Sequence, residues 1–296
     1  MATFDEVGIR YLTAASVQAF RDNSALWCLR YLFGKSDFRS AAFARSVALN
    51  NGLKHILHTG DVSYGEDLAL ESYVRQCEEW GLDVMADPAA RSEHDTLLEH
   101  LSGAVKAINE NLGGFPRPIA SGLATHAFIG EFNTPFLSVP SFIFEDVQLH
   151  VKYTHRCPSK IQPKDMMAMS VDAAARMQPP RVLYVTTKKH LWGVPTPADL
   201  ALARYCLEED ALALQRFLGA CETPEQALAM CPLNSEFYQW KPQLLSDARS
   251  ILLNHTEKLN AALRSEVGGR LSEGPHRLPH RDLLSDYRPG DAEIDG

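Results

Sequence analysis

The hydrophobic pattern of this 296-residue chain changes its period between residues 126 and 190, and this change limits the possible folds. Four segments there are short, rich in β-branched and aromatic residues and bounded by turns, which predicts four strands. They are HAFIGEF, PSFIFED, VQLHVKYTH and RVLYVTTKKH. Pro163 and the apolar spacing of the following KDMMAMSVDAAARM predict a helix between the last two strands. The chain is thus expected to cross over into a parallel or mixed sheet, after three strands that follow one another antiparallel.

Helical spacing of apolar residues precedes these strands. Residues 11–34 predict two short helices, the first of them capped by Thr13. Residues 40–58 predict an amphipathic helix that counts Phe43 among its apolar positions. Residues 61–112 are polar and acidic, with two helical stretches, and are expected to present a solvated face.

The C-terminal part divides into a helical stretch and a tail. The pattern is helical from Pro197 to about Arg264, whereas residues 265–296 are rich in Gly, Pro and charge and predict a flexible segment. The sequence therefore predicts an α/β fold in a single domain over residues 1–264. Its parts are a helical lobe, a sheet core and C-terminal helices, at 1–112, 113–195 and 196–264.

Composition restricts the class of protein. The formal net charge is −8, from 29 Lys and Arg against 37 Asp and Glu, which argues against strong non-specific nucleic-acid binding but allows a local basic groove. No apolar run approaches the ~18 residues of a membrane span, and the N-terminus lacks the apolar segment of a secretory signal. A cytoplasmic protein without a membrane partner is expected. Its six scattered cysteines are expected to be reduced thiols.

Five stretches in order resemble one family, the phage-type RecB-like exonucleases of the PD-(D/E)XK superfamily. TAASVQAFRDNSALWCLRYLFG is similar to the family's opening "L-S-A-S-S…ALW…YLF", and RSVALNNGL falls at its "R-G-x-A-V-E-x-x". VQLHVKYTHRCPSKIQPKD falls at "D-L-K-T-T-H-R-x-P-S", RVLYVTTKKH at "xFLYVSTKK" and CPLNSEFYQW at a late "P-x-x-x-x-F-Y-W". The resemblance covers the chain to about residue 255.

The resemblance implies a restriction-endonuclease-like core, with a mixed central sheet flanked by helices, and a metal-dependent site. Hard cations such as Mg²⁺ take oxygen ligands, mostly carboxylates. In the family, an Asp on one strand and an acid on the next hold the metal, and a Lys two residues further stabilises the attacking hydroxide. An acid or His on an N-terminal helix completes the metal site, and a Gln…Tyr pair on the following helix contacts the substrate.

This sequence departs from the family at almost every site position. The resemblance places the helix acid at Asn50, the two strand acids at Ser141 and His150, the lysine at Lys152, and the Gln…Tyr pair at Ala168 and Asp172. Only Lys152 keeps the family's residue. The sequence therefore predicts a catalytically degenerate nuclease homologue without a metal site, and cysteines too widely spaced for the iron–sulfur cluster that some relatives hold.

Two alternatives stay open at this stage. A rearranged Mn²⁺ or Mg²⁺ site would use His150 and Glu131, taken to lie on a neighbouring strand, and would make the chain an active DNA exonuclease. A protein-interaction module that has lost DNA binding would agree with the net charge of −8.

The leading expectation is a DNA-binding or scaffolding component of phage-type DNA replication or recombination. The resemblance places a cation-rich strand–helix–strand face against the DNA backbone, and phosphate contacts need only such side chains. Its predicted DNA-binding residues are Lys152, Arg156, Lys160, Lys164, Lys188 and Lys189. Expected partners are DNA, other phage replication or recombination proteins, or an active nuclease paralogue, in the cytoplasm of a bacterial host cell.

Overall fold

The N-terminal region is helical, and its helices begin at capping side chains. The computed structural model describes residues 4–35, 40–114, 116–175, 178–233 and 242–271. The Thr13 hydroxyl accepts a hydrogen bond from the Ser16 N–H, and the Asn23 side chain accepts one from the Leu26 N–H. The predicted cap at Thr13 is confirmed. The helical elements here are η1 (Asp5–Val7), α1 (Ala14–Asp22), α2 (Ser24–Tyr31), α3 (Ala41–Thr59), α4 (Val62–Glu79), α5 (Pro88–Asp95) and α6 (Leu97–Leu112).

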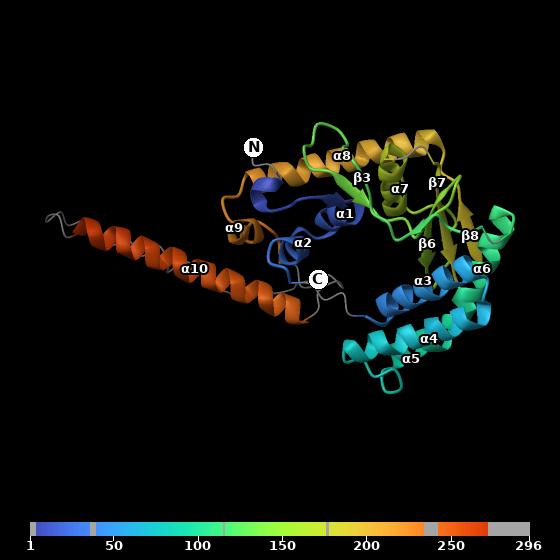
Figure 1. Cartoon of the computed structure of the whole chain (residues 1–296). Coiled ribbons are helices and arrows are strands. Elements are labelled where there is room, and N and C mark those ends of the chain that lie inside the picture. The colour runs from blue at the N-terminus through green and yellow to red at the C-terminus, as the bar shows by residue number, and fades with distance from the viewer. Residues whose placement is uncertain (1–3, 36–39, 115, 176–177, 234–241, 272–296) are drawn as a thin grey trace, which may run out of the picture. The chain divides into compact units, whose positions relative to one another are not determined.

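The sheet core has the predicted crossover. β5 (Phe142–Ile143) pairs antiparallel with β6 (Gln148–Tyr153), and α7 (Pro163–Ala175) carries the chain to β7 (Pro180–Val185), parallel to β6. Two strands complete the sheet order β2-β5-β6-β7-β8, namely β2 (Ala120–Ser121) and β8 (His190–Gly193), both antiparallel to their neighbours. Figure 1 shows α7 on one side of β6 and β7 and α3 and α6 on the other.

The prediction that the segment HAFIGEF joins this sheet as the first of three successive antiparallel strands is wrong. Its strand, β3 (Thr125–Ala127), pairs antiparallel with β4 (Phe136–Ser138), which pairs parallel with β1 (Leu12–Thr13). These strands form a separate three-stranded sheet of order β1-β4-β3. The sequence pattern missed β1, β2 and β4 because strands of two or three residues are too short to show a period. It also missed β8, because the segment RVLYVTTKKH, predicted as one strand, ends as a strand at Val185 and a new strand begins at His190.

The two faces of β6 have different characters. Leu149, Val151 and Tyr153 point into the main apolar core together with residues of α3 and α6. His150 and Lys152 alternate with them and therefore face α7. The smaller apolar cluster on that side contains Met169, Val182 and Tyr184. Buried polar side chains such as His150 lie on the same side of the sheet.

One residue assigned to the core of the amphipathic helix lies outside it. Phe43 is 48% exposed, because the buried stripe of α3 passes through Ala44 and Ala48 instead. Its ring stacks on Trp80 of the acidic region, with ring centroids 5.8 Å apart. The helix itself is confirmed, with Ser40 as its cap.

The C-terminal part is helical, with α8 (Pro197–Gly219), α9 (Pro224–Ala229) and α10 (Pro242–Leu271). Thr196 caps α8 in a reciprocal pair of hydrogen bonds with Asp199. The chain separates into two compact units, Met1–Ala248 and Arg249–Gly296, so that α10 crosses the boundary. The domain limit at residue 264 and the tail over 265–296 stay predictions, although α10 runs to Leu271. Within the described residues, no helix is long and apolar enough to cross a membrane.

Candidate functional site

The candidate site lies on the α7 side of the β5–β6 hairpin, where the resemblance places the two strand acids. Phe142 pairs with Leu149, and one residue before it the Ser141 hydroxyl accepts a hydrogen bond from the Val151 N–H at 3.0 Å. Ser141 is half-buried and serves to hold the hairpin together. The serine therefore satisfies a backbone donor at the position where the family has a metal-binding carboxylate.

His150 is paired with Asp172 across the gap between β6 and α7. The His150 Nε2 lies 2.5 Å from Oδ2 of Asp172, and the Thr125 hydroxyl donates to Oδ1 of the same carboxylate at 2.7 Å. Asp172 is completely buried and His150 is 4% exposed. Asp172, which the resemblance places where the family has its substrate-contacting Tyr, is therefore enclosed by its own protein partners.

Lys152 has a second carboxylate of α7 as its partner. Its Nζ lies 3.3 Å from Oδ1 of Asp165, while the Tyr184 hydroxyl donates to Oδ2 at 2.6 Å. Burial raises the pKa of the Tyr184 hydroxyl, and its hydrogen bond to Asp165 raises that pKa further, so this hydroxyl stays a donor. The lysine predicted as the catalytic remnant is thus neutralised from within the fold.

Neither pair was predicted from the sequence, although the spacing of the four residues indicates both. Asp165 and Asp172 are seven residues apart, which puts them on one face of α7, and His150 and Lys152 share one face of β6. Because α7 carries the chain back between two parallel strands, it runs opposite to β6. The later aspartate therefore meets the earlier residue of the strand.

The remaining predicted positions add no metal ligand. Asn50 on α3 is half-buried, and its buried Oδ1 has no hydrogen-bond partner among the described residues. Ala168 is half-buried on α7. Glu131 is an exposed turn residue beyond the end of β3, so the expectation that it stands on a strand is wrong.

The residues on this face do not fit a magnesium site. Hard divalent cations need several oxygen ligands free to coordinate them, mostly carboxylates. Here both carboxylates are held by Lys152 and His150, and a strand acid is replaced by a serine. Within the described part of the chain, no group of three or more His, Cys, Asp or Glu side chains is placed to hold a metal ion.

A second buried ion pair ties the acidic region to the end of β6. Arg45 of α3 pairs with Glu93 of α5 and donates to the Tyr153 carbonyl oxygen at 3.0 Å. His155 lies 3.2 Å from the other oxygen of Glu93. Arg45 and Glu93 are only 3% and 6% exposed, so the helical region 61–112 is not purely a solvated face. This cluster was not predicted from the sequence, because its members are far apart in the chain.

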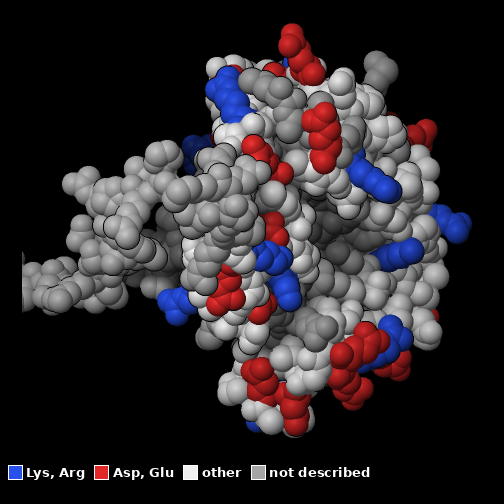
Figure 2. Space-filling model, turned by 90° about the vertical axis from the view of Figure 1, so that its left-hand side faces the viewer, with Lys and Arg blue, Asp and Glu red and all other residues white. Residues whose placement is uncertain are grey.

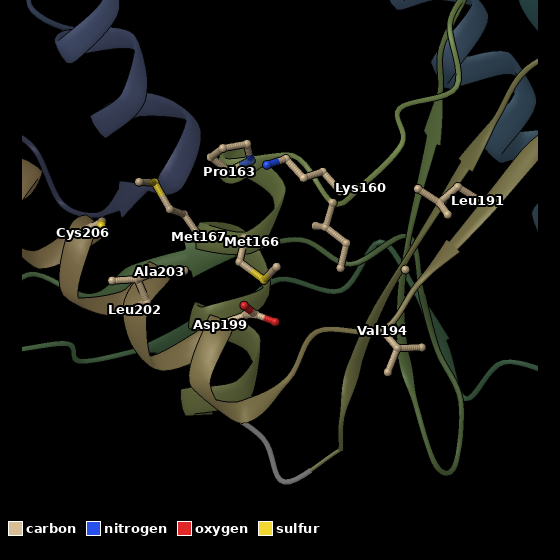
Figure 3. Close-up of a pocket in the computed structure, with 12 residues that line it drawn as sticks. Lys160, Pro163, Met166, Met167, Leu191, Val194, Asp199, Leu202, Ala203 and Cys206 are labelled. Carbon is tan, nitrogen blue, oxygen red and sulfur yellow. The ribbon is translucent and has the colours of Figure 1, made fainter.

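Three of the six predicted DNA-binding cations line two separate hollows, and the other three line neither of them. Lys160 lines a cavity of about 550 Å³ between β8, α7 and α8, where Figure 3 shows it opposite Asp199 across Met166 and Met167. Lys188 and Lys189 line another of about 520 Å³, against α4 and α6. Arg156 and Lys164 are exposed and, unlike Lys152, form no ion pair with a described residue.

Acidic side chains accompany these cations on the surface. The hollow beside Lys188 and Lys189 also contains Glu66 and Glu99. Figure 2 shows one face of the molecule, on which blue and red side chains are interspersed around a central hollow. The local fields of the two signs therefore partly cancel on that face.

The fold and site define a mixed α/β protein with a helical N-terminal region, mixed sheets and C-terminal helices. No family model matches the sequence, and no curated protein matches it. The structure is distantly similar to a candidate exonuclease from Eubacterium rectale, at a TM-score of 0.48 and 10% identity, over 70% of this chain and 80% of that one. It is also similar to the protein SSO0001, at a TM-score of 0.30 and 14% identity, over 57% of this chain and 85% of that one.

Proposed function

We propose that this chain is a PD-(D/E)XK-type nuclease homologue that has lost metal-dependent cleavage and acts as a DNA-binding or scaffolding component of phage-type DNA replication or recombination. The motif resemblance and the order of β5, β6, α7 and β7 support the superfamily. The observation that carries the loss of cleavage is the double pairing of β6 with α7. His150 and Lys152 are both held by buried aspartates.

The cleavage reaction requires carboxylates free to bind a metal and a lysine free to stabilise the attacking hydroxide, and this pairing removes both. A metal would have to displace His150 from Asp172 or Lys152 from Asp165 before either carboxylate could coordinate it. The lysine would also have to leave Asp165 before it could stabilise charge on an attacking hydroxide. The retained fold is therefore better suited to binding than to hydrolysis.

A binding role uses the exposed cations near the start of α7. Arg156, Lys160 and Lys164 are exposed and lie within nine residues of chain. They can neutralise phosphates without any metal, since phosphate contacts depend on charge and position. The net charge of −8 restricts such binding to this locality and keeps it weak at high salt.

The first experiment measures cleavage of labelled single- and double-stranded DNA in Mg²⁺ and in Mn²⁺, with Lys152→Ala as the control. We expect no degradation by either protein at high protein concentration. Degradation by the unaltered chain that disappears in Lys152→Ala would overturn the proposal and would favour the active exonuclease.

The second experiment measures DNA affinity as a function of salt. Neutralising three phosphates gives a slope of log K against log salt of about −3, at ~0.9 per phosphate. The triple variant Arg156→Ala, Lys160→Ala, Lys164→Ala should lose most of this slope. The matched triple variant Lys54→Ala, Arg75→Ala, Arg91→Ala, which removes the same charge from exposed residues of the N-terminal helices, should keep it. Equal losses in both variants, or no binding at low salt, would favour a protein-interaction module.

A further inference from the structure

Two buried thiols that are distant in the sequence meet where α2 packs against α9. Cys28 lies in α2 and Cys231 follows α9, 203 residues later, and their Sγ atoms are 3.8 Å apart. All six cysteines of the chain are described and free, and this is the pair whose sulfur atoms are in contact. A disulfide bond is ~2.05 Å long, so the two atoms need to approach by less than ~2 Å.

The two thiols differ in their surroundings and therefore in their chemistry. Cys28 is completely buried, and its hydrogen bond to Cys231 together with burial raises its pKa. The same hydrogen bond lowers the pKa of Cys231, and a hydrogen bond with Ser24 adds to this, while burial opposes it. When protonated, Cys231 donates to the Ala227 carbonyl oxygen at 3.2 Å. Cys231, which keeps 7% exposure, is the more nucleophilic member of the pair.

We infer that Cys231 is a site of oxidation by hydrogen peroxide and that the product is a reversible disulfide with Cys28. The Cys231 thiolate attacks a peroxide oxygen, the O–O bond breaks, and hydroxide leaves and is protonated to water. The Cys28 sulfur then attacks the sulfenic acid on Cys231, the S–O bond breaks, and a second water leaves with the Cys28 proton. One hydrogen peroxide molecule is reduced and two thiols are oxidised, and a dithiol reverses the reaction by exchange.

The cross-link would join the two ends of the first compact unit. It would hold α2 against the segment after α9 and close a loop of 203 residues, which restricts the unfolded chain far more than the native one. The oxidised protein should consequently melt at a higher temperature than the reduced protein.

A third thiol provides an internal competitor. Cys221 is half-buried, lines a cavity of about 310 Å³ beside α9, and has its sulfur 3.5 Å from that of Met230. It is more accessible to peroxide than Cys231, but burial raises its pKa. Cys231 has the Cys28 sulfur within 3.8 Å, whereas the neighbour of the Cys221 sulfur is a thioether that cannot form a disulfide, so the first reaction is assigned to Cys231.

The test treats the reduced full-length protein with hydrogen peroxide and maps its peptides by mass spectrometry without reduction. We expect a linked pair of peptides that contain Cys28 and Cys231, two hydrogens lighter than their sum, and their separation by dithiothreitol. The melting temperature should rise on the order of 5 °C on oxidation. Cys231→Ser and Cys28→Ala should each abolish the link and this rise, whereas Cys206→Ser, at a half-buried thiol of α8, should keep both.

Three outcomes would overturn the inference, and each can be read on the unaltered chain. The first is a link that involves Cys221 in place of Cys28. The second is oxidation of Cys231 to sulfinic acid without any link. The third is the survival of both thiols in folded protein at peroxide concentrations that oxidise the more exposed Cys157.

Discussion

Single residues on the α7 side of the β5–β6 hairpin are tied into the protein's own hydrogen bonds and ion pairs. Ser141 satisfies a backbone N–H, His150 holds Asp172, and Lys152 holds Asp165. Each side chain that stands at a family site position on these strands therefore has a local structural role. These side chains are compatible with one another, because the two carboxylates of α7 face the nitrogen-bearing side chains of β6.

Substitutions of His150 and Asp172 should have non-additive effects on the free energy of unfolding. We expect His150→Leu to destabilise the protein by about 3–5 kcal/mol, because it leaves the buried Asp172 carboxylate without its His150 partner. The double variant His150→Leu, Asp172→Leu should be more stable than His150→Leu alone, since it removes both polar groups of the buried pair. Urea unfolding of the two single variants and the double variant measures this. Additive losses would show that the two side chains act independently.

At the scale of elements, α3 and α4 can pack closely because glycine stands where they cross. α3 and α4 cross where Gly52 and Gly65 meet, and a Cβ on Gly65 would lie 2.3 Å from Cγ1 of Ile56. Both helices were readable from apolar spacing, but this contact was not. Residues 61–112 looked polar and solvated, whereas their small residues allow α4 to approach α3 closely.

Gly65→Ala should therefore destabilise the protein, although alanine favours helices. We expect a loss of about 1–3 kcal/mol from overpacking, measured by chemical denaturation. Ser63→Ala, two residues away on the exposed side of α4, is the matched control and should change stability by less than about 0.5 kcal/mol. A stabilised Gly65→Ala variant would mean that the two helices can separate at little cost.

At the scale of the whole molecule, the division into two units makes a prediction about truncation. The first unit ends at Ala248, and the part of α10 inside it buries Leu244 and Ala248. A chain that ends at residue 248 should unfold in one transition, within about 3 °C of the full chain by calorimetry, because it keeps these buried residues.

Leu244→Ala in the full chain tests whether the buried residues of α10 before residue 248 stabilise the first unit. It should cost about 2–5 kcal/mol through the lost apolar contact. If the truncated chain is destabilised as much as Leu244→Ala, contacts beyond residue 248 stabilise the first unit and the prediction is wrong.

The sequence by itself determined the helical regions, the cap at Thr13, the crossover through α7 and the absence of carboxylates at Ser141 and His150. These features depend on residues close together in the chain, where period, capping and turn chemistry act directly. Only the tertiary structure decided that β3 leaves the main sheet, that Asp165 and Asp172 close the site, and that Cys28 meets Cys231. Contacts of this kind depend on how whole elements pack, and a residue's own neighbours in the sequence carry little information about its partner across the core.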